Sequence, residues 1–160
     1  MAQHQVEVVI TQPQGDAEEH GAGSTTPGVV DLNSTDLELG MMGTGMVGLR
    51  FTGVPIPSGA RIVSAYLQFT CDEVGNSVGG ALSISAEASP NPAPFSFWPR
   101  DLSSRLKLTQ VVHWTNLAPW ERSGAIGVAQ RSPDLGSLVQ SLIDQPSWNS
   151  GQALALFVSG

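Results

Sequence analysis

VGLRFTGVPIPSGARIVSAYLQFT, residues 47–70, is the stretch that decides the fold class. Apolar and polar side chains alternate on both sides of a turn that contains Pro55, Pro57 and Gly59. Proline presets φ and glycine tolerates positive φ, so these residues favour a reversal of the chain. Alternation with a period of two over this length predicts two strands of a half-buried antiparallel sheet.

The alternation also predicts which side chains share a face. Before the turn, Leu49 and Phe51 fall on one face, and the opposite face carries Arg50 and Thr52. After the turn, the inward face carries Ala65, Leu67, Phe69 and Cys71, and the outward face carries Tyr66, Gln68, Thr70 and Asp72. Cys71, the single cysteine, is therefore predicted to be a buried free thiol, which behaves as a small apolar side chain.

Other short strands and loops are predicted along the whole chain. The strand-like pieces are residues 6–10, two pieces within 29–39, 81–89, 109–114 and 153–158. Between them we expect a long polar loop at 12–28, turns or loops at 40–48 and 74–80, and a proline-rich loop at 89–99. Proline cannot donate a hydrogen bond to a sheet, so the last of these is a loop or an edge.

One segment, residues 133–145, is predicted to be helical. Its apolar residues recur at helical spacing and form one stripe: Leu135, Leu138, Val139, Leu142 and Ile143. Ser132 is the predicted N-cap, Pro133 suits the first helical position, and Pro146 ends the run. One short helix among many short strands predicts an all-β fold, an antiparallel β-sandwich with the helix covering one edge or end.

The length and the net charge of the chain limit the number of domains and the classes of partner. The 160 residues suit a single domain, residues 1–160, and 41% of them are hydrophobic. Fourteen acidic and seven basic residues give a net charge of −7, which disfavours nucleic acid and anionic membranes as partners. The chain has no apolar run long enough to span a bilayer and begins without a basic leader, so we expect neither membrane insertion nor a signal peptide in the chain as given.

Carboxylates gather near the N-terminus without basic partners. The first 49 residues contain seven acidic residues and no Lys or Arg. Such a group is either a solvated acidic loop or a site for Ca²⁺, which takes six to eight oxygen ligands. The candidate calcium ligands are Asp16, Glu18, Asp36, Glu38 and Asp72.

The tryptophans divide into structural and exposed candidates. Trp114 and Trp148 belong to apolar strand patterns and are expected in the core. Trp98 and Trp120 lie in loop-like segments and are the candidates for stacking on sugar rings, with capping of the core as the alternative. No pattern of a catalytic nucleophile or of a transition-metal site is present, so we expect a protein that is not an enzyme.

Several pieces of the chain together resemble a known family. They are GDAEE, NSTDLELG, the central stretch extended to Glu73, SSR, VVHW, AQRSPDLGSLVQSLIDQPSW and SGQALALFVSG. This order is similar to that of the DNRLRE-type jelly-roll modules of large secreted bacterial proteins, some of which bind carbohydrate. The resemblance implies a jelly-roll β-sandwich, extracellular or surface display, no catalysis and a structural calcium ion. No sugar-contacting residue is carried over from the family.

Two functions remain open from the sequence. The first is a non-catalytic, surface-displayed binding or adhesion module whose ligand is a glycan. The second is a structural subunit of an extracellular or virion assembly, such as a filament, coat or decoration protein. The strand at 153–158, ALALFV, is apolar on both faces and nothing follows it, so one of its edges is expected to pair with residues 6–10 or with a neighbouring subunit of a homo-oligomer.

Overall fold

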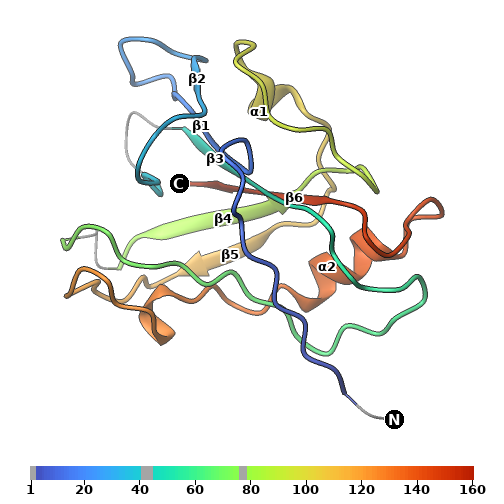
Figure 1. Cartoon of the computed structure of the whole chain (residues 1–160). Coiled ribbons are helices and arrows are strands. Elements are labelled where there is room, and N and C mark those ends of the chain that lie inside the picture. The colour runs from blue at the N-terminus through green and yellow to red at the C-terminus, as the bar shows by residue number, and fades with distance from the viewer. Residues whose placement is uncertain (1–2, 41–44, 76–78) are drawn as a thin grey trace.

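One antiparallel sheet of six strands forms the centre of the computed structural model, which describes residues 3–40, 45–75 and 79–160 (Figure 1). The strand order is β2-β1-β3-β6-β4-β5. The strands are β1 (Asp16–Glu19), β2 (Val30–Asp31), β3 (Met46–Phe51), β4 (Ala81–Ala86), β5 (Val112–Thr115) and β6 (Leu154–Ser159). The helical pieces are α1 (Asp101–Ser104), the 3-10 turn η1 (Val128–Gln130) and α2 (Gly136–Ile143). The prediction of a mostly β, antiparallel chain with little helix is confirmed.

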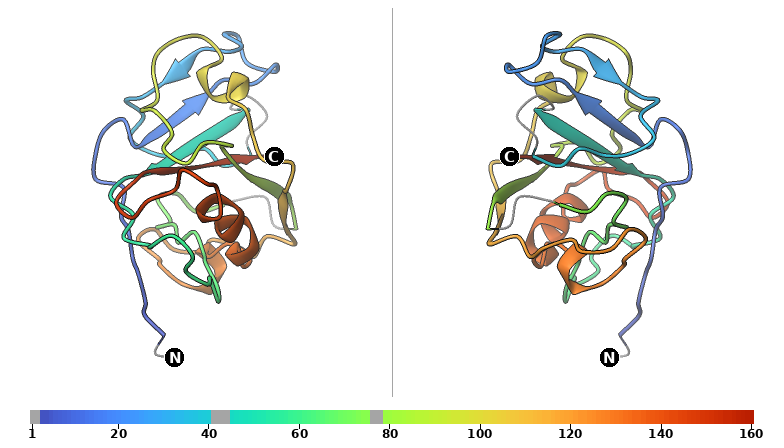
Figure 2. Two further views of the ribbon diagram at one scale, coloured as in Figure 1. Left: turned by 90° about the vertical axis from the view of Figure 1, so that its right-hand side faces the viewer. Right: turned by 90° about the vertical axis from the view of Figure 1, so that its left-hand side faces the viewer.

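The two faces of the sheet are covered by different parts of the chain. Figure 2 shows α1 and α2 on opposite sides of the strands. We call the larger cluster the α2-side core; its buried members include Leu49, Leu67, Ile84, Leu138, Leu142, Ile143, Trp148 and Leu156. The smaller cluster is the α1-side core: Ala17, Val30, Leu32, Phe95, Leu102, Ala155 and Phe157.

β6 lies in the middle of the sheet and is buried on both faces. Leu154, Leu156 and Val158 belong to the α2-side core, and the alternate residues Ala155 and Phe157 belong to the α1-side core. β3 pairs along one edge of β6 and β4 along the other. Both edges of β6 are thus occupied by β3 and β4, so the prediction that residues 6–10 or a neighbouring subunit pair with one of them is wrong. Residues 6–10 pair with no strand; Val8 and Ile10 instead pack against the α2-side core.

The stretch at 47–70 keeps its predicted faces but not its predicted pairing. β3 pairs with β1 and β6, so it forms no hairpin with the residues after the turn. Those residues cross to the α2 side, where Leu67 and Cys71 are buried and Tyr66 and Gln68 are exposed, as the alternation predicts. Backbone hydrogen bonds join this segment to residues 125–135: Cys71 N to Ala125 O, Phe69 N to Gln130 O, Ser132 N to Leu67 O and Leu135 N to Ala65 O.

The predicted helix is present in shortened form as α2, and its apolar stripe is buried. Leu135 is its N-cap residue, so the prediction for Ser132 is wrong. The Ser132 hydroxyl instead accepts a hydrogen bond from Leu67 N at 2.9 Å and donates one to Pro133 O. The hydroxyl that was expected to cap the helix therefore links it to the neighbouring segment.

The remaining predicted elements are partly reproduced. β4 falls within the predicted strand at 81–89, and β5 overlaps the predicted strand at 109–114. Of the two strand-like pieces predicted within 29–39, the structure contains only β2. The predicted polar loop at 12–28 is wrong at its centre, because β1 lies there. The predicted loop at 40–48 is wrong at its end, because β3 begins at Met46. Residues 41–44 of that prediction and 76–78 of the predicted loop at 74–80 lie outside the described residues.

Candidate functional site

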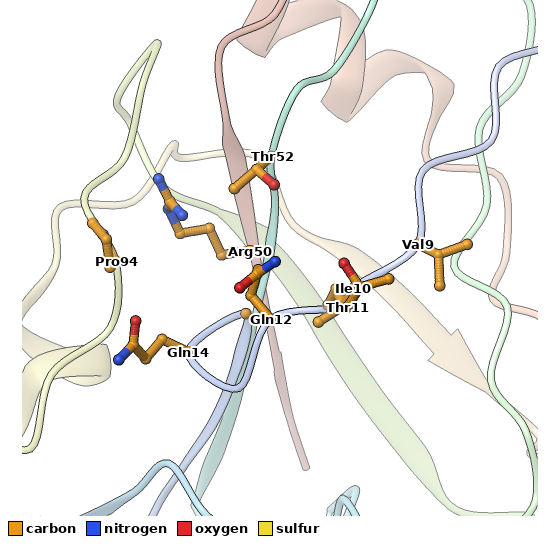
Figure 3. A pocket seen from close by; sticks show the side chains of 9 residues that line it. Val9, Ile10, Thr11, Gln12, Gln14, Arg50, Thr52 and Pro94 are labelled. Atoms are coloured by element: carbon orange, nitrogen blue, oxygen red, sulfur yellow. The ribbon is translucent and has the colours of Figure 1, made fainter.

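A small polar pocket lies where the N-terminal segment crosses the end of β3 (Figure 3). It has a volume of about 100 Å³. It is lined by Val9, Ile10, Thr11, Gln12, Gln14, Gly15, Arg50, Thr52 and Pro94. Figure 3 shows the carboxamides of Gln12 and Gln14 and the side chain of Arg50 around this space, with Pro94 on the facing loop. Amide, hydroxyl and guanidinium groups that converge in a hollow are typical of a site that orients a polar ligand.

Tight backbone packing holds the N-terminal wall of the pocket. Gly15 N donates to Gln12 O at 2.8 Å, and Arg50 N donates to Gly15 O at 2.6 Å. A Cβ atom on residue 15 would stand 2.5 Å from Ile10 Cγ2 and 3.0 Å from Gln12 O. Only glycine therefore fits where this loop turns into β1, and the turn fixes the positions of Gln12 and Gln14.

Arg50 is the charged group of the pocket. Its Nε donates to the carbonyl oxygen of Pro92 at 2.9 Å, which ties β3 to the proline-rich loop. Within the described residues the ion pairs are Arg105–Glu87 and Arg105–Asp101, so Arg50 has none. Burial lowers the pKa of Arg50, the nearby positive charge of Arg105 lowers it further, and Glu87 opposes this shift.

An aromatic surface adjoins the pocket. Phe97 and Trp98 are 62% and 78% exposed, although large aromatic side chains are normally well buried. They line an open hollow together with Gln14, Leu32, Phe95 and Ser96. Gln14 lines both this hollow and the polar pocket. The two together form one surface, which we call the pocket–platform site.

Arg105 anchors the loop that carries the aromatic pair. Its guanidinium forms ion pairs with Glu87 at 3.0 Å and Asp101 at 2.9 Å, and it donates to Ala93 O and Pro94 O, both at 2.8 Å. It also stands 4.8 Å from the centre of the Phe95 ring. Burial lowers the pKa of Arg105, but its bonds to the two carboxylates more than offset this, and the pKa is raised. The loop is thus fixed by directional contacts to one side chain.

The two tryptophans predicted to bind ligand have different surroundings. Trp98 is exposed in the pocket–platform site. Trp120 is half-buried: its indole N–H donates to Ala129 O at 2.9 Å, and its ring lies 6.4 Å from that of Phe69. Trp120 therefore caps the α2-side core, which was the alternative reading. Trp114 and Trp148 are buried, as predicted.

Of the five predicted calcium ligands, Asp36 and Glu38 lie near enough to Glu18 for their charges to act on its carboxylate. Glu18, on β1, is only 7% exposed, and its Oε1 accepts a hydrogen bond from Glu38 N at 2.6 Å. Burial raises the pKa of Glu18, bonds from Glu38 N and the Ser34 hydroxyl oppose the rise, and the charges of Glu38 and Asp36 add to it. These carboxylates belong to a strand and the segment beside it, not to the acidic loop that was predicted.

The other two predicted ligands do not complete this group. Burial raises the pKa of Asp16, which is at the start of β1 opposite Leu49. Asp72 is exposed on the α2 side. Its neighbour Cys71 forms backbone hydrogen bonds with Gly124 and Ala125 on that side. Across residues 3–40, 45–75 and 79–160, no group of three or more His, Cys, Asp or Glu side chains is arranged to hold a metal ion. Calcium binding stays a prediction.

Sequence reasoning missed the polar half of the site. Gln12 and Gln14 lay in a presumed polar loop, and Phe97 was not singled out. The alternation of residues 49–52 did place Arg50 and Thr52 on one face, away from Leu49 and Phe51, and both line the pocket. That shared face was the available signal, but the facing wall comes from Pro94 and residues 9–15, which the alternation does not locate.

The chain matches no family model, no curated protein and no solved structure. In the described part of the chain, neither helix combines the length and the apolar character that a membrane crossing requires.

Proposed function

We propose that this protein is a non-catalytic, surface-displayed binding module whose ligand is a glycan. The observation that carries the proposal is the exposed Phe97–Trp98 pair beside a polar pocket, with Gln14 lining both. A sugar ring has an apolar C–H face that stacks on an aromatic ring and a rim of hydroxyls that need hydrogen-bond partners. The pocket–platform site offers both kinds of contact.

The proposal includes a jelly-roll fold and an extracellular setting, as the resemblance to DNRLRE-type modules implies. The backbone bonds between residues 65–71 and 125–135 support a second, irregular layer facing the six-stranded sheet. The resemblance itself rests on sequence pieces alone.

The experiment is a binding screen of the purified chain on immobilised glycans, followed by calorimetry with any hit. Trp98→Ala is expected to weaken binding at least tenfold, because stacking on the most exposed aromatic ring is lost. The matched control is Tyr66→Ala, which removes an exposed aromatic side chain on the α2 side. Absence of binding across the screen, or equal losses in both variants, would contradict the proposal.

The second candidate is a structural subunit of an extracellular or virion assembly. Two observations favour it. β5 is at the end of the strand order, and exposed apolar side chains, among them Ile126 and Val128, lie on the α2 side. Addition of a strand at β6 is not part of this candidate, because both edges of β6 are occupied. Light scattering at high concentration tests it: a large symmetric assembly supports a subunit, and a monomer supports the binding module.

Structural calcium is the remaining part of the proposal, with Glu18 and its charged neighbours Asp36 and Glu38 as the candidate ligands. A cation that binds only the folded state raises the melting temperature as its free concentration rises. The melting curve is therefore expected to shift upward between chelator and millimolar calcium. An unchanged curve contradicts calcium binding and leaves the glycan proposal standing.

A further inference from the structure

We propose that the pocket around Arg50 selects glycans that bear a carboxylate, the group found on uronic and sialic acids. This inference rests on the proposed function and names the class of sugar that the same site takes. Arg50 is the only charged residue among the nine that line the pocket, and it is basic in a chain whose net charge is −7.

Arg50 keeps hydrogen-bond donors that a ligand could use. Nε is used by Pro92 O, and Nη1 and Nη2 donate to no residue in the described part of the chain. The ends of a guanidinium form a planar fork that matches the two oxygens of a carboxylate. The side chain is thus held at one nitrogen and presents the other two.

Arg50 and Arg105 differ in how their charges are balanced. Arg105 is neutralised by Glu87 and Asp101, whereas Arg50 forms no ion pair with any residue that the structure describes. Arg50 is also partly buried, and desolvation penalises its charge. Glu87 and Arg105 are the charged groups that act on it, with opposite signs. A bound anion would supply the ionic contact that the described residues do not make.

The pocket is the size of a substituent of a sugar. A volume of about 100 Å³ is well below the 300–1,000 Å³ of typical small-molecule sites, so the pocket suits a substituent and not a whole ligand. Thr11, Gln12 and Thr52 line the same space and supply further hydrogen-bonding groups. The Phe97–Trp98 surface remains available for a sugar ring, and Gln14 contacts both parts of the site.

The test compares each acidic sugar with a neutral counterpart of the same stereochemistry. One pair is trigalacturonate and its methyl ester, and the other is sialyllactose and the methyl ester of its sialic acid; together they distinguish uronate from sialate. Calorimetry of the wild-type chain is expected to give at least tenfold tighter binding of one acid than of its neutral counterpart. That difference should shrink between 50 and 300 mM NaCl, because salt screens a partly exposed charge pair.

Variants of Arg50 then locate the effect. Arg50→Gln should bring the ratio of acid to neutral affinity to about one, and Arg50→Lys should leave an intermediate ratio, because lysine keeps the charge but loses the planar fork. Tyr66→Ala is the control that should keep the full ratio. The wild-type comparison needs no variant, so the test holds even if loss of the bond to Pro92 O disturbs the loop.

Each outcome has a distinct meaning. Equal affinity for acid and neutral sugars overturns the selection of carboxylate and leaves glycan binding in place. Tighter binding of a sulfated sugar than of either acid also overturns it. Absence of binding to any of these sugars and to the glycan screen removes the proposed function together with the inference.

Discussion

The two faces of the sheet are closed by different kinds of interaction. On the α2 side, large apolar side chains such as Leu138, Leu142 and Trp148 fill the space. On the α1 side the apolar cluster is smaller, and buried charges complete it. Glu19, only 6% exposed, accepts hydrogen bonds from Leu102 N and Ser103 N at 2.9 and 2.8 Å.

Two cations complete the α1 side. Arg105 holds the proline-rich loop, and Lys107 Nζ donates to Leu102 O at 2.7 Å while it stands 4.4 Å from the centre of the Phe157 ring. Apolar burial is non-directional, whereas these bonds fix the position of particular backbone atoms. We therefore expect the α2 side to contribute more of the stability, and the α1 side to position the loop that carries the pocket–platform site.

The largest expected effect is on the α2 side. Leu142→Ala should lower the free energy of unfolding by about 2–5 kcal/mol, because it removes a fully buried side chain and leaves a cavity. Urea unfolding measures the change, with Ser141→Ala, at an exposed position of the same helix, as control. If Leu142→Ala has no effect on stability, the α2-side core is not what holds the fold.

The next effect is on the α1 side. Glu19→Ala should cost about 1–3 kcal/mol, because it leaves the buried N–H of Leu102 and the N–H of Ser103 without an acceptor. Glu19→Gln keeps one side-chain oxygen and should cost less. Amide hydrogen exchange of Leu102 and Ser103 should accelerate in the alanine variant. A cost equal to that of Leu142→Ala would erase the contrast between the two faces.

A smaller change separates stability from positioning. Arg105→Lys should cost about 1 kcal/mol, since lysine keeps the charge but cannot make the four bonds of the guanidinium. Hydrogen exchange in residues 88–100 should rise, and affinity for the glycan should fall. Arg131→Lys, a change at an exposed arginine on the α2 side, is the control. Unchanged exchange and affinity would show that Arg105 does not position the loop.

The smallest effect concerns the buried carboxylate of Glu18. Its pKa is raised in the folded state, so the folded protein binds a proton more readily than the unfolded chain does, and its contribution to stability falls as pH rises through the window above 4.5. Glu18→Gln removes this term and keeps an acceptor for Glu38 N. The variant should therefore melt slightly higher than wild type at pH 7 and no higher at pH 4. The opposite order at pH 7 in the presence of calcium would point to a bound cation.

Local sequence patterns correctly predicted the features that do not depend on which strand or segment is adjacent. The alternation of residues 65–71 and the apolar stripe of α2 each depend on one buried face, and both faces are correct. The hairpin was wrong because alternation says which side is buried and not which strand is adjacent. The neighbours of β3 are β1 and β6, and β6 is about one hundred residues away along the chain.

β1 and the candidate site could not be predicted from the sequence for a related reason. The sequence of β1, DAEE, is one that normally indicates a polar loop. It is tolerated in a buried strand because the carboxylates of Glu18 and Glu19 accept hydrogen bonds from the backbone N–H groups of residues 38, 102 and 103. Such donors are far away in sequence and leave no local signal. Trp98 could be found because a tryptophan among prolines suggests exposure, whereas Gln12 and Gln14 become meaningful only beside Arg50.

The central place of β6 also has a consequence for how the protein folds. β2, β1 and β3 form one set of paired strands and β4 and β5 another, and β6, the last element in the sequence, joins them. Until β6 is in place, the inner edges of β3 and β4 are unpaired and open to association with other chains. Pairing over such long sequence separations slows folding. We therefore expect the nascent chain to be most prone to aggregate in the period before β6 emerges from the ribosome.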